Sequence, residues 1–236
     1  MTDIPALAIC LLTYKRTYEA METIFSTCEH LKYPKEAIRW YVADDGSDEQ
    51  HHSSILQAIE KNGMQLLGHH NNRFRHDDTY NCGKGWNQGL GICHQYSDHV
   101  LWLEDDWKME ADLQLMPYIQ LLEENHNVGI VTFRILSMGA DVHTEGYNGE
   151  MFLNYQRTTQ YAYSGNPLLR HARYTKFYGW YDEKRSPGLI ELSQDDLYRY
   201  NEDMKTLRAD GPEIWRPANL DPWGGWHHIG KDKTWK

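Results

Sequence analysis

The chain has 236 residues, with 34 Asp and Glu against 24 Lys and Arg and therefore a formal charge of −10. This length suffices for one large α/β domain, and 40% hydrophobic with 25% charged residues argues against a disordered chain. The acidic balance argues against broad electrostatic binding of nucleic acid or of an anionic membrane surface. Four scattered cysteines without a CxxC motif argue against a zinc knuckle or a dense disulfide framework.

In the first half, strands alternate with helices. Apolar runs predict five buried strands at residues 6–12, 38–43, 64–67, 100–103 and 128–133. Near-helical spacing of apolar residues predicts helices over 17–31 and 53–61. This alternation indicates a βαβ sheet with right-handed crossovers, in which polar residues at the carboxyl ends of strands face the ligand. Polar clusters follow the first, second and fourth of these strands.

The second half carries weaker signals. Residues 138–184 are rich in Gly, Tyr and Asn with little periodicity, and residues 195–207 predict a polar helix. There is no internal repeat and no linker, which indicates one domain. The apolar stretch of the N-terminal segment, residues 4–12, is far too short to span a bilayer and follows no basic leader. We therefore expect a cytoplasmic protein.

Three adjacent acids, Glu104, Asp105 and Asp106, close the fourth predicted strand. Adjacent carboxylates repel one another, so either a solvated turn or a divalent cation must relieve them. Carboxylate oxygens suit Mg²⁺ or Mn²⁺, which keep waters and bind substrate phosphates. The position at the end of a strand favours the metal over the solvated turn.

Glycine-rich loops of the GxxxxGK[ST] or GxGxxG type, which usually cradle phosphates, are absent from the sequence. A metal ion would then have to hold a diphosphate. Residues 83–89 predict a glycine-punctuated turn before a short helix, in which Lys84 could approach a phosphate.

Taken in order, these motifs resemble the GT-A family 2 glycosyltransferases, which use nucleotide sugars. The matching segments are the Thr-Tyr-Asn-Arg-like turn at 13–16, the Asp-Asp-Gly-Ser motif at 44–47, the Asn-x-Gly segment at 87–89 and the Asp-x-Asp-like motif at 104–106. The resemblance implies an α/β GT-A fold, with a single Rossmann-like, mostly parallel sheet flanked by helices. It also implies a nucleotide-sugar-binding half over about 1–107 and an acceptor-binding half over about 108–236.

The resemblance assigns the donor site. Thr13, Tyr14 and Asp45 would hold a base and ribose of the uridine type, with Asp44 in support. Further residues assigned to the nucleotide are Arg16, Lys84, Asn87 and Asp105. Trp86 stands where the family usually has an Arg, so the family's phosphate contact from that position is missing.

The resemblance also implies a metal cofactor, Mn²⁺ or Mg²⁺. Asp106 would bind it directly, and the longer Glu104 would contact it through water. Several metal-dependent GT-A enzymes bring a late histidine to the metal, and here His227 and His228 are the candidates. An exposed histidine pair in a tail is the alternative. Candidate walls of the sugar or acceptor site are Trp180, Trp223 and Trp226.

Two segments of the second half resemble the family more faintly. Residues 177–183 are similar to its Gly-Gly-Phe-Asp-Glu loop, which implies that Gly179, Trp180 and Asp182 lie beside the sugar or acceptor. Residues 193–197 are similar to its Glu-Asp motif, which supplies the catalytic base in inverting members. Asp195 overlays that motif best, and Asp196 is the other candidate. A cluster of acids capping a helix is the alternative interpretation.

The resulting prediction is an inverting, metal-dependent glycosyltransferase with a nucleotide-sugar donor of the UDP type. A nucleotidyltransferase is a different class, but it would normally need a glycine-rich basic loop after the first strand. A non-catalytic nucleotide-sugar binder is a third hypothesis. The acceptor is open between a glycan, a protein and a modified base in viral DNA. The last idea rests on basic residues at Arg73, Arg75, Arg170, Arg173, Lys231, Lys233 and Lys236, against the net charge.

Overall fold

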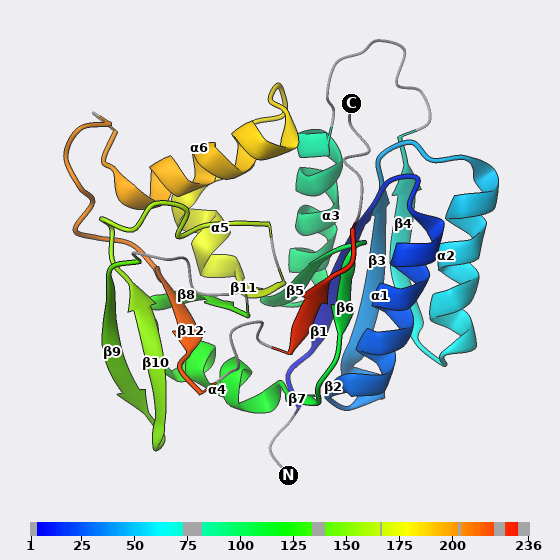
Figure 1. Ribbon diagram of the computed structural model, residues 1–236, viewed down its shortest axis with the longest axis horizontal. Coiled ribbons are helices and arrows are strands. Elements are labelled where there is room, and N and C mark those ends of the chain that lie inside the picture. Colours follow the sequence, from blue (N-terminus) through cyan, green and yellow to red (C-terminus); the bar gives the residue numbers. More distant parts are fainter. Residues whose placement is uncertain are drawn as a thin grey trace.

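The computed structural model describes residues 4–72, 82–133, 140–165, 167–202, 204–219 and 225–230. Their largest element is a mixed sheet of nine strands in the order β4-β3-β1-β5-β11-β8-β12-β10-β9 (Figure 1). These strands are β1 (Leu7–Thr13), β3 (Ile38–Asp44), β4 (Gln65–Asn71), β5 (His99–Glu104), β8 (Val128–Thr132), β9 (Val142–Tyr147), β10 (Glu150–Tyr155), β11 (Leu168–His171) and β12 (Glu213–Pro217).

Helices cover both faces of this sheet. They are α1 (Thr17–His30), α2 (Glu49–Lys61), α3 (Cys82–Tyr96), α4 (Met116–Glu124), α5 (Ala172–Tyr178) and α6 (Pro187–Arg199), with a short 3₁₀ turn η1 (Lys35–Ala37). Two small sheets complete the described fold, one of β2 (Leu31–Lys32) with β7 (Leu113–Gln114) and one of β6 (Trp107–Met109) with β13 (Trp226–His228).

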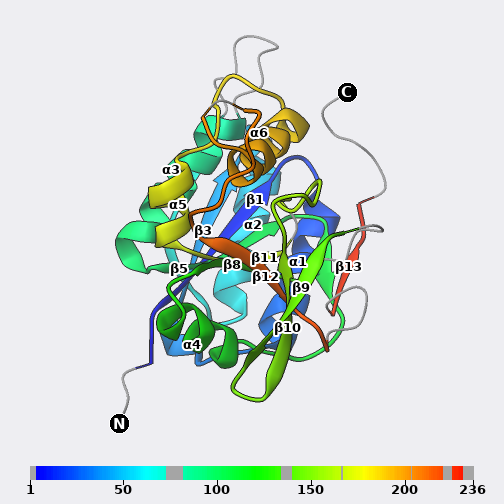
Figure 2. The same cartoon turned by 90° about the vertical axis from the view of Figure 1, so that its left-hand side faces the viewer.

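The burial of β1 explains why helices lie on both faces of the sheet. All seven residues of this strand are buried. Its odd-numbered residues pack with α1, α2 and α4, whereas Ala8, Cys10 and Leu12 pack with α3, α5 and α6. Successive side chains of a strand point to opposite faces, so a run that is apolar at every position needs cover on both. Figure 2 shows α3 and α5 to the left of β1 and α1 to its right.

The parallel strands align the polar turns predicted from the sequence. β1 pairs in parallel with both β3 and β5, and the register sets Thr13 opposite Asp44 and Leu12 opposite Glu104. Because the carboxyl ends of parallel strands lie at one edge of a sheet, the turns after these three strands meet there. The predicted α/β fold is confirmed, with a parallel half from β4 to β5.

The rest of the sheet is mixed rather than parallel. β11 runs antiparallel to both β5 and β8, and β10 runs antiparallel to β9 and β12. The β9–β10 hairpin turns at Asn148 and Gly149, both with positive φ (48° and 81°). Asn-Gly is the preferred pair for such a turn, so the sequence carried a hairpin signal within the segment of little periodicity at 138–184.

Two sequence predictions are wrong. The helix expected over 195–207 is α6, which begins eight residues earlier at Pro187, because Ser186-Pro187 is a typical helix start. The turn expected over 83–89 is instead the first half of α3. Its glycines permit close packing: a Cβ on Gly83 would lie 2.8 Å from the carbonyl oxygen of Asp182, and one on Gly89 3.0 Å from Cys10 Sγ.

No helix in the described ranges is both long and apolar enough to cross a bilayer.

Candidate active site

The turn after β1 is built around a buried carboxylate from the turn after β5. Thr13 donates its hydroxyl to Asp105 Oδ2 (2.9 Å), and the backbone N–H of Tyr14 donates to the same oxygen (2.9 Å). Having donated to Asp105, the Thr13 hydroxyl accepts from His51 Nε2 (2.8 Å). Burial lowers the pKa of His51, which keeps the ring in the neutral form that this arrangement uses. Thr13 and Asp105 therefore shape the turn.

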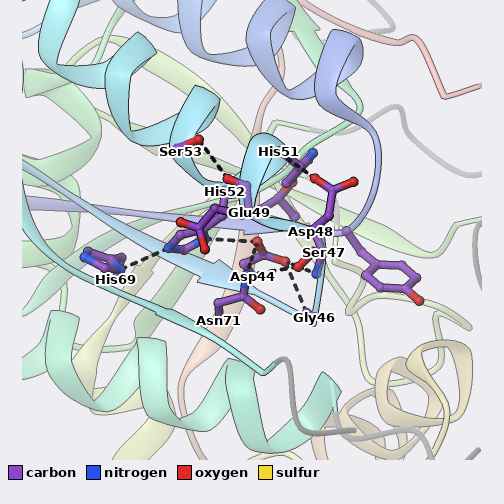
Figure 3. A network of polar contacts seen from close by, with 12 residues as sticks. Asp44, Gly46, Ser47, Asp48, Glu49, His51, His52, Ser53, His69 and Asn71 are labelled. Atoms are coloured by element: carbon purple, nitrogen blue, oxygen red, sulfur yellow. Dashed lines mark hydrogen bonds and ion pairs between the residues drawn. The ribbon is translucent and has the colours of Figure 1, made fainter.

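The turn after β3 is organised by Asp44, which is fully buried (Figure 3). Its Oδ1 accepts from the N–H groups of Gly46 (3.1 Å) and Ser47 (2.9 Å), and its Oδ2 contacts His52 Nδ1 (3.0 Å) and Asn71 Nδ2 (3.2 Å). Four donors satisfy this carboxylate, so Asp44 holds the backbone of the turn. The neighbouring Asp45 is half-buried, and its backbone N–H donates to Thr13 O (3.0 Å).

Arg16 joins the acids of the third turn. Its guanidinium contacts Asp105 Oδ1 (3.3 Å) and also Asp106 Oδ2. Burial and the adjacent Asp106 charge raise the pKa of Asp105 to about 7, although Tyr14, Arg16 and Thr13 oppose the shift. One cation thus lies between two carboxylates that would otherwise repel each other.

The short strand β13 brings a histidine to Asp106. It pairs with β6 so that His228 lies opposite Trp107, and His228 Nε2 is 3.1 Å from Asp106 Oδ2. The backbone N–H of Ile229 also donates to Asp106 O (2.8 Å). The other oxygen, Asp106 Oδ1, is buried and has no hydrogen-bond partner among the described residues. His227 precedes His228 on the strand, so its side chain points to the opposite face.

A second carboxylate pair lies beside this acid cluster. Glu104 Oε1 and Glu191 Oε1 lie 2.6 Å and 2.7 Å from the point where a Cβ on Gly165 would sit. The Gly165 N–H donates to Glu191. Burial, with the charges of Glu191, Asp106 and Asp105, raises the pKa of Glu104 well above its ordinary value. So many carboxyl groups in one place favour a cation beside them.

Asp195 lies one helical turn after Glu191 on α6 and is only 3% exposed. It accepts from the backbone N–H groups of Tyr161 (2.9 Å) and Tyr163 (3.1 Å), and Arg199 NH1 is 3.8 Å away. Burial raises the pKa of Asp195, and these donors oppose the rise. The carboxylate is thereby used to hold the 161–163 segment. Asp196, the other predicted base, is half-buried on the same helix.

The remaining predicted residues lie along α3 and the segment after α5. Asn87 pairs its amide with the backbone of Tyr181 through two 2.9 Å hydrogen bonds, so it holds that segment. Lys84 is exposed on α3. Gly179, with φ of 84°, ends α5, and Trp180 follows it, 51% exposed. Asp182 is half-buried and accepts from Lys184 N (3.0 Å) and Arg185 Nε (2.8 Å), which lower its pKa.

Two further sequence expectations are wrong. Trp226 packs in the core under α1 and is 1% exposed, so it walls no sugar or acceptor site. Arg170 is fully buried and lies over the rings of Tyr174 (4.9 Å) and Tyr181 (5.3 Å), so it offers no surface charge to nucleic acid. Outside the described residues lie Trp223, Arg73, Arg75, Lys231, Lys233 and Lys236.

Sequence reasoning missed several residues that build the site. His51, His52 and Glu191 lie on helices, where their spacing resembles that of ordinary surface residues. Only the tertiary packing shows that His52 Nδ1 meets Asp44 and that its Nε2 meets His69 Nδ1 (3.1 Å). One signal was readable: Glu191 is the third acid of the helix that carries both candidate bases, Asp195 and Asp196.

No protein-family model matches this sequence, and no curated protein matches it either. Solved structures do resemble it. S. aureus TarS 1-349 in complex with UDP aligns over 91% of this chain at 13% identity (TM-score 0.60). GalNAc-T7 with UDP, GalNAc and Mn²⁺ aligns over 98% at 10% identity (TM-score 0.61). The mannosyltransferase PcManGT from Pyrobaculum calidifontis, with GDP-Man and Mn²⁺, aligns over 92% at 13% identity (TM-score 0.52).

The alignments cover 58%, 44% and 58% of those three chains, so this chain spans about half of each. At such low identity the likeness concerns the fold alone. The chain has the GT-A fold of nucleotide-sugar glycosyltransferases.

Proposed function

We propose that this protein is a metal-dependent glycosyltransferase that transfers a sugar from a nucleotide donor, of the UDP type, to an acceptor hydroxyl with inversion. The observation that carries the proposal is Asp106. This buried carboxylate is shared by Arg16 and His228, and it keeps one oxygen without a hydrogen-bond partner among the described residues. An acid left short of donors, beside an imidazole and further carboxylates, is a ligand set that suits Mn²⁺.

The proposed metal ligands are Asp106 and His228, with Glu104 near them. When bound, the metal ion would neutralise the negative charge that develops on the leaving diphosphate. Of the similar structures, GalNAc-T7 and PcManGT were determined with Mn²⁺, which supports this cofactor. The Arg16 guanidinium contacts both Asp105 and Asp106, and from this position it would also meet the phosphates.

The nucleotide would lie over the turns after β1 and β3. Tyr14 and Asp45 are half-buried at the surface of these turns, where they can meet a base and ribose. Thr13, Asp44 and Asp105 lie beneath them and fix the backbone that presents them. TarS was determined with UDP and with UDP-GlcNAc, which supports a uridine donor.

The geometry favours a different acceptor-side base from the one that the sequence predicts. Asp195, predicted for it, is buried and already accepts from two backbone N–H groups. Glu191 lies one turn earlier on α6, next to Glu104 and therefore next to the proposed metal ligands. We assign the base to Glu191 and a positioning task to Asp195. In the transfer, the acceptor oxygen bonds to the sugar's anomeric carbon as its bond to phosphate breaks, and the hydroxyl proton passes to Glu191.

A thermal-shift panel of nucleotide sugars, with and without Mn²⁺, tests the proposed function, because a ligand that binds only the folded protein raises its melting temperature. We expect a shift with UDP-sugars that depends on Mn²⁺. Slow hydrolysis of the bound UDP-sugar would separate a transferase from a non-catalytic binder. If nucleoside triphosphates shift the melting temperature and nucleotide sugars do not, the nucleotidyltransferase hypothesis replaces ours.

The two adjacent histidines supply a matched pair for the metal. His228→Ala removes a proposed ligand, so the Mn²⁺ concentration for a half-maximal thermal shift should rise about tenfold or more. His227→Ala, on the opposite face of β13, should leave that concentration unchanged. An equal response of the two variants would remove His228 from the metal site.

A further inference from the structure

A second cluster of metal-ligating side chains lies at the end of the sheet opposite the candidate active site. His99 begins β5, and His171 ends β11 directly opposite it in the antiparallel register. Glu123 reaches them from α4, which lies at the bottom of the sheet in Figure 1, whereas α6 lies at the top. β5 carries Glu104 at its other end, so five residue steps of about 3.3 Å separate the two sites by roughly 17 Å.

The geometry brings three ligating atoms together. Glu123 Oε1 lies 3.1 Å from His99 Nε2 and 4.0 Å from His171 Nε2, and all three atoms lie within 4.8 Å of one another. The two rings meet edge to face, with centroids 5.1 Å apart. Tetrahedral zinc with bonds of about 2.0 Å places its ligands about 3.3 Å apart, so small side-chain movements would complete the set.

The state of the two histidines also suits a metal. Both are buried, with side chains 3% and 11% exposed. Burial lowers the pKa of His99, and burial with the Arg173 charge lowers the pKa of His171 to about 3, so both rings are neutral near pH 7. His99 Nε2 is buried and makes no well-aligned hydrogen bond, although it faces the Glu123 carboxylate. His99 Nε2 is therefore a buried nitrogen whose hydrogen-bonding capacity is not used among the described residues.

We propose that His99, His171 and Glu123 form an exchangeable Zn²⁺ site, separate from the catalytic metal. Two imidazoles and one carboxylate leave a fourth position for water, and imidazole ligands favour Zn²⁺ over the Mn²⁺ or Mg²⁺ that carboxylates select. The ion would tie α4 to the paired ends of β5 and β11. This inference does not depend on the proposed function.

The Arg173 side chain competes with the metal ion for His171 Nε2. Its NH2 group lies 3.0 Å from His171 Nε2, and its backbone N–H lies 3.1 Å from His171 Nδ1. A neutral imidazole has one lone pair, so it cannot accept from both donors. Binding through Nε2 displaces the guanidinium NH2 group, while NH1 keeps the carbonyl oxygens of Asn125 (3.2 Å) and Val128 (2.7 Å). Because the ion must also turn Nδ1 into a donor, the site should be weak and exchangeable.

The test uses the full chain without a polyhistidine tag and titrates Zn²⁺ alone, followed by calorimetry and by melting temperature. In the Asp106→Asn background, where the proposed catalytic metal site lacks a ligand, we expect one zinc ion to bind and to raise the melting temperature. Glu123→Gln should weaken binding at least about tenfold. Glu124→Gln is the matched control, because this neighbouring glutamate is also exposed and faces Tyr147 instead. Arg173→Gln should tighten the binding by removing the competing charge.

Two variants distinguish failure of the zinc proposal from failure of the proposed function. Asp106→Asn should leave the Zn²⁺ response intact, and Glu123→Gln should leave the response to UDP with Mn²⁺ intact. Co²⁺ in place of Zn²⁺ should show the absorption of a tetrahedral site, which surface histidines do not produce. The proposal is overturned if Glu123→Gln and Glu124→Gln bind zinc alike, or if the unaltered protein shows no melting-temperature response to Zn²⁺.

Discussion

The turns after β3 and β5 present adjacent acids at the same edge of the sheet, yet the protein treats them differently. After β3, Asp44 is fully buried and four donors satisfy its two oxygens. After β5, Asp106 is also buried but has one oxygen without a partner among the described residues and shares the other between the Arg16 guanidinium and the His228 ring. A satisfied carboxylate holds the backbone, and an unsatisfied one is available to a ligand.

The same contrast recurs on α6. Asp195 accepts from the 161–163 backbone and so stabilises a loop, whereas Glu191 is brought against another acid, Glu104. Two like charges side by side are unfavourable unless a proton, a cation or a substrate relieves them. The contrast therefore separates residues that build the site from residues that we expect to act in it.

The largest expected effect distinguishes Asp106 from Asp44. Asp106→Asn should abolish metal-stimulated transfer while the fold persists, because the change removes a proposed ligand and keeps the side chain's shape. Asp44→Asn should instead lower the free energy of unfolding by about 1–3 kcal/mol, because backbone donors lose a charged acceptor. Transfer assays with Mn²⁺ and denaturant unfolding of both variants measure the two effects. Unchanged transfer in Asp106→Asn, with no effect of EDTA, would remove the metal from the mechanism.

The next effect distinguishes Glu191 from Asp195. A positioned base typically supplies about 10²–10⁴-fold in rate, so Glu191→Gln should slow transfer by that factor while donor binding persists. Its rate should also lose the acidic limb of the pH profile. Asp195→Asn should lower the melting temperature and affect transfer less, with Asp196→Asn as the mildest change.

The reverse result, with Asp195→Asn crippling transfer at an unchanged melting temperature, would restore the base predicted from the family motif. A product that keeps the donor's anomeric configuration would show a retaining enzyme. In that case neither Glu191 nor Asp195 would be the acceptor-side base of an inverting reaction.

A smaller effect distinguishes Asp45 from its neighbour Asp44. Asp45 is half-buried at the surface of the turn, whereas Asp44 lies beneath it. Asp45→Ala should weaken UDP binding by about 1–3 kcal/mol, the range for a lost hydrogen bond to a charged group, with little change in melting temperature. Calorimetric titration with UDP and Mn²⁺ measures this. If the variant and the unaltered protein bind UDP with equal affinity, the uracil base does not contact Asp45.

The smallest effect concerns two half-buried histidines, His70 and His94, whose hydrogen-bond partners are neutral. Burial lowers the pKa of His70 and of His94 to about 4. Unfolded histidine titrates near 6.5, so between these values the unfolded chain holds the extra protons. Stability should be fully present above about pH 6.5 and fall as the pH drops toward 4, by at most about 1.4 kcal/mol per pH unit for each group.

Denaturant unfolding at a series of pH values measures that slope. His94→Gln should make it shallower, since glutamine can still bond Thr175 and does not titrate in this range. His143→Gln, at an exposed position on β9, is the matched control. A slope that His94→Gln leaves unchanged would show that this histidine is charged in the folded protein.

The sequence by itself determined the parallel half of the fold and the turns that face the ligand. A strand apolar at every position, such as residues 7–12, has to be covered on both faces, and polar clusters after three such strands have to meet at one edge. Local chemistry was equally readable at Asp48, which caps α2 by accepting from His51 N (2.8 Å). These features depend on neighbours in the chain.

Only the tertiary structure decided which acids are satisfied and which are not. The donors to Asp105, Asp106 and Asp195 come from residues 32 to 122 positions away, so no spacing rule could place them. The same holds for Glu191 beside Glu104, and for His99 with Glu123 and His171. Sequence pattern reports burial along one element, whereas the partner of a buried polar group is set by how distant elements pack.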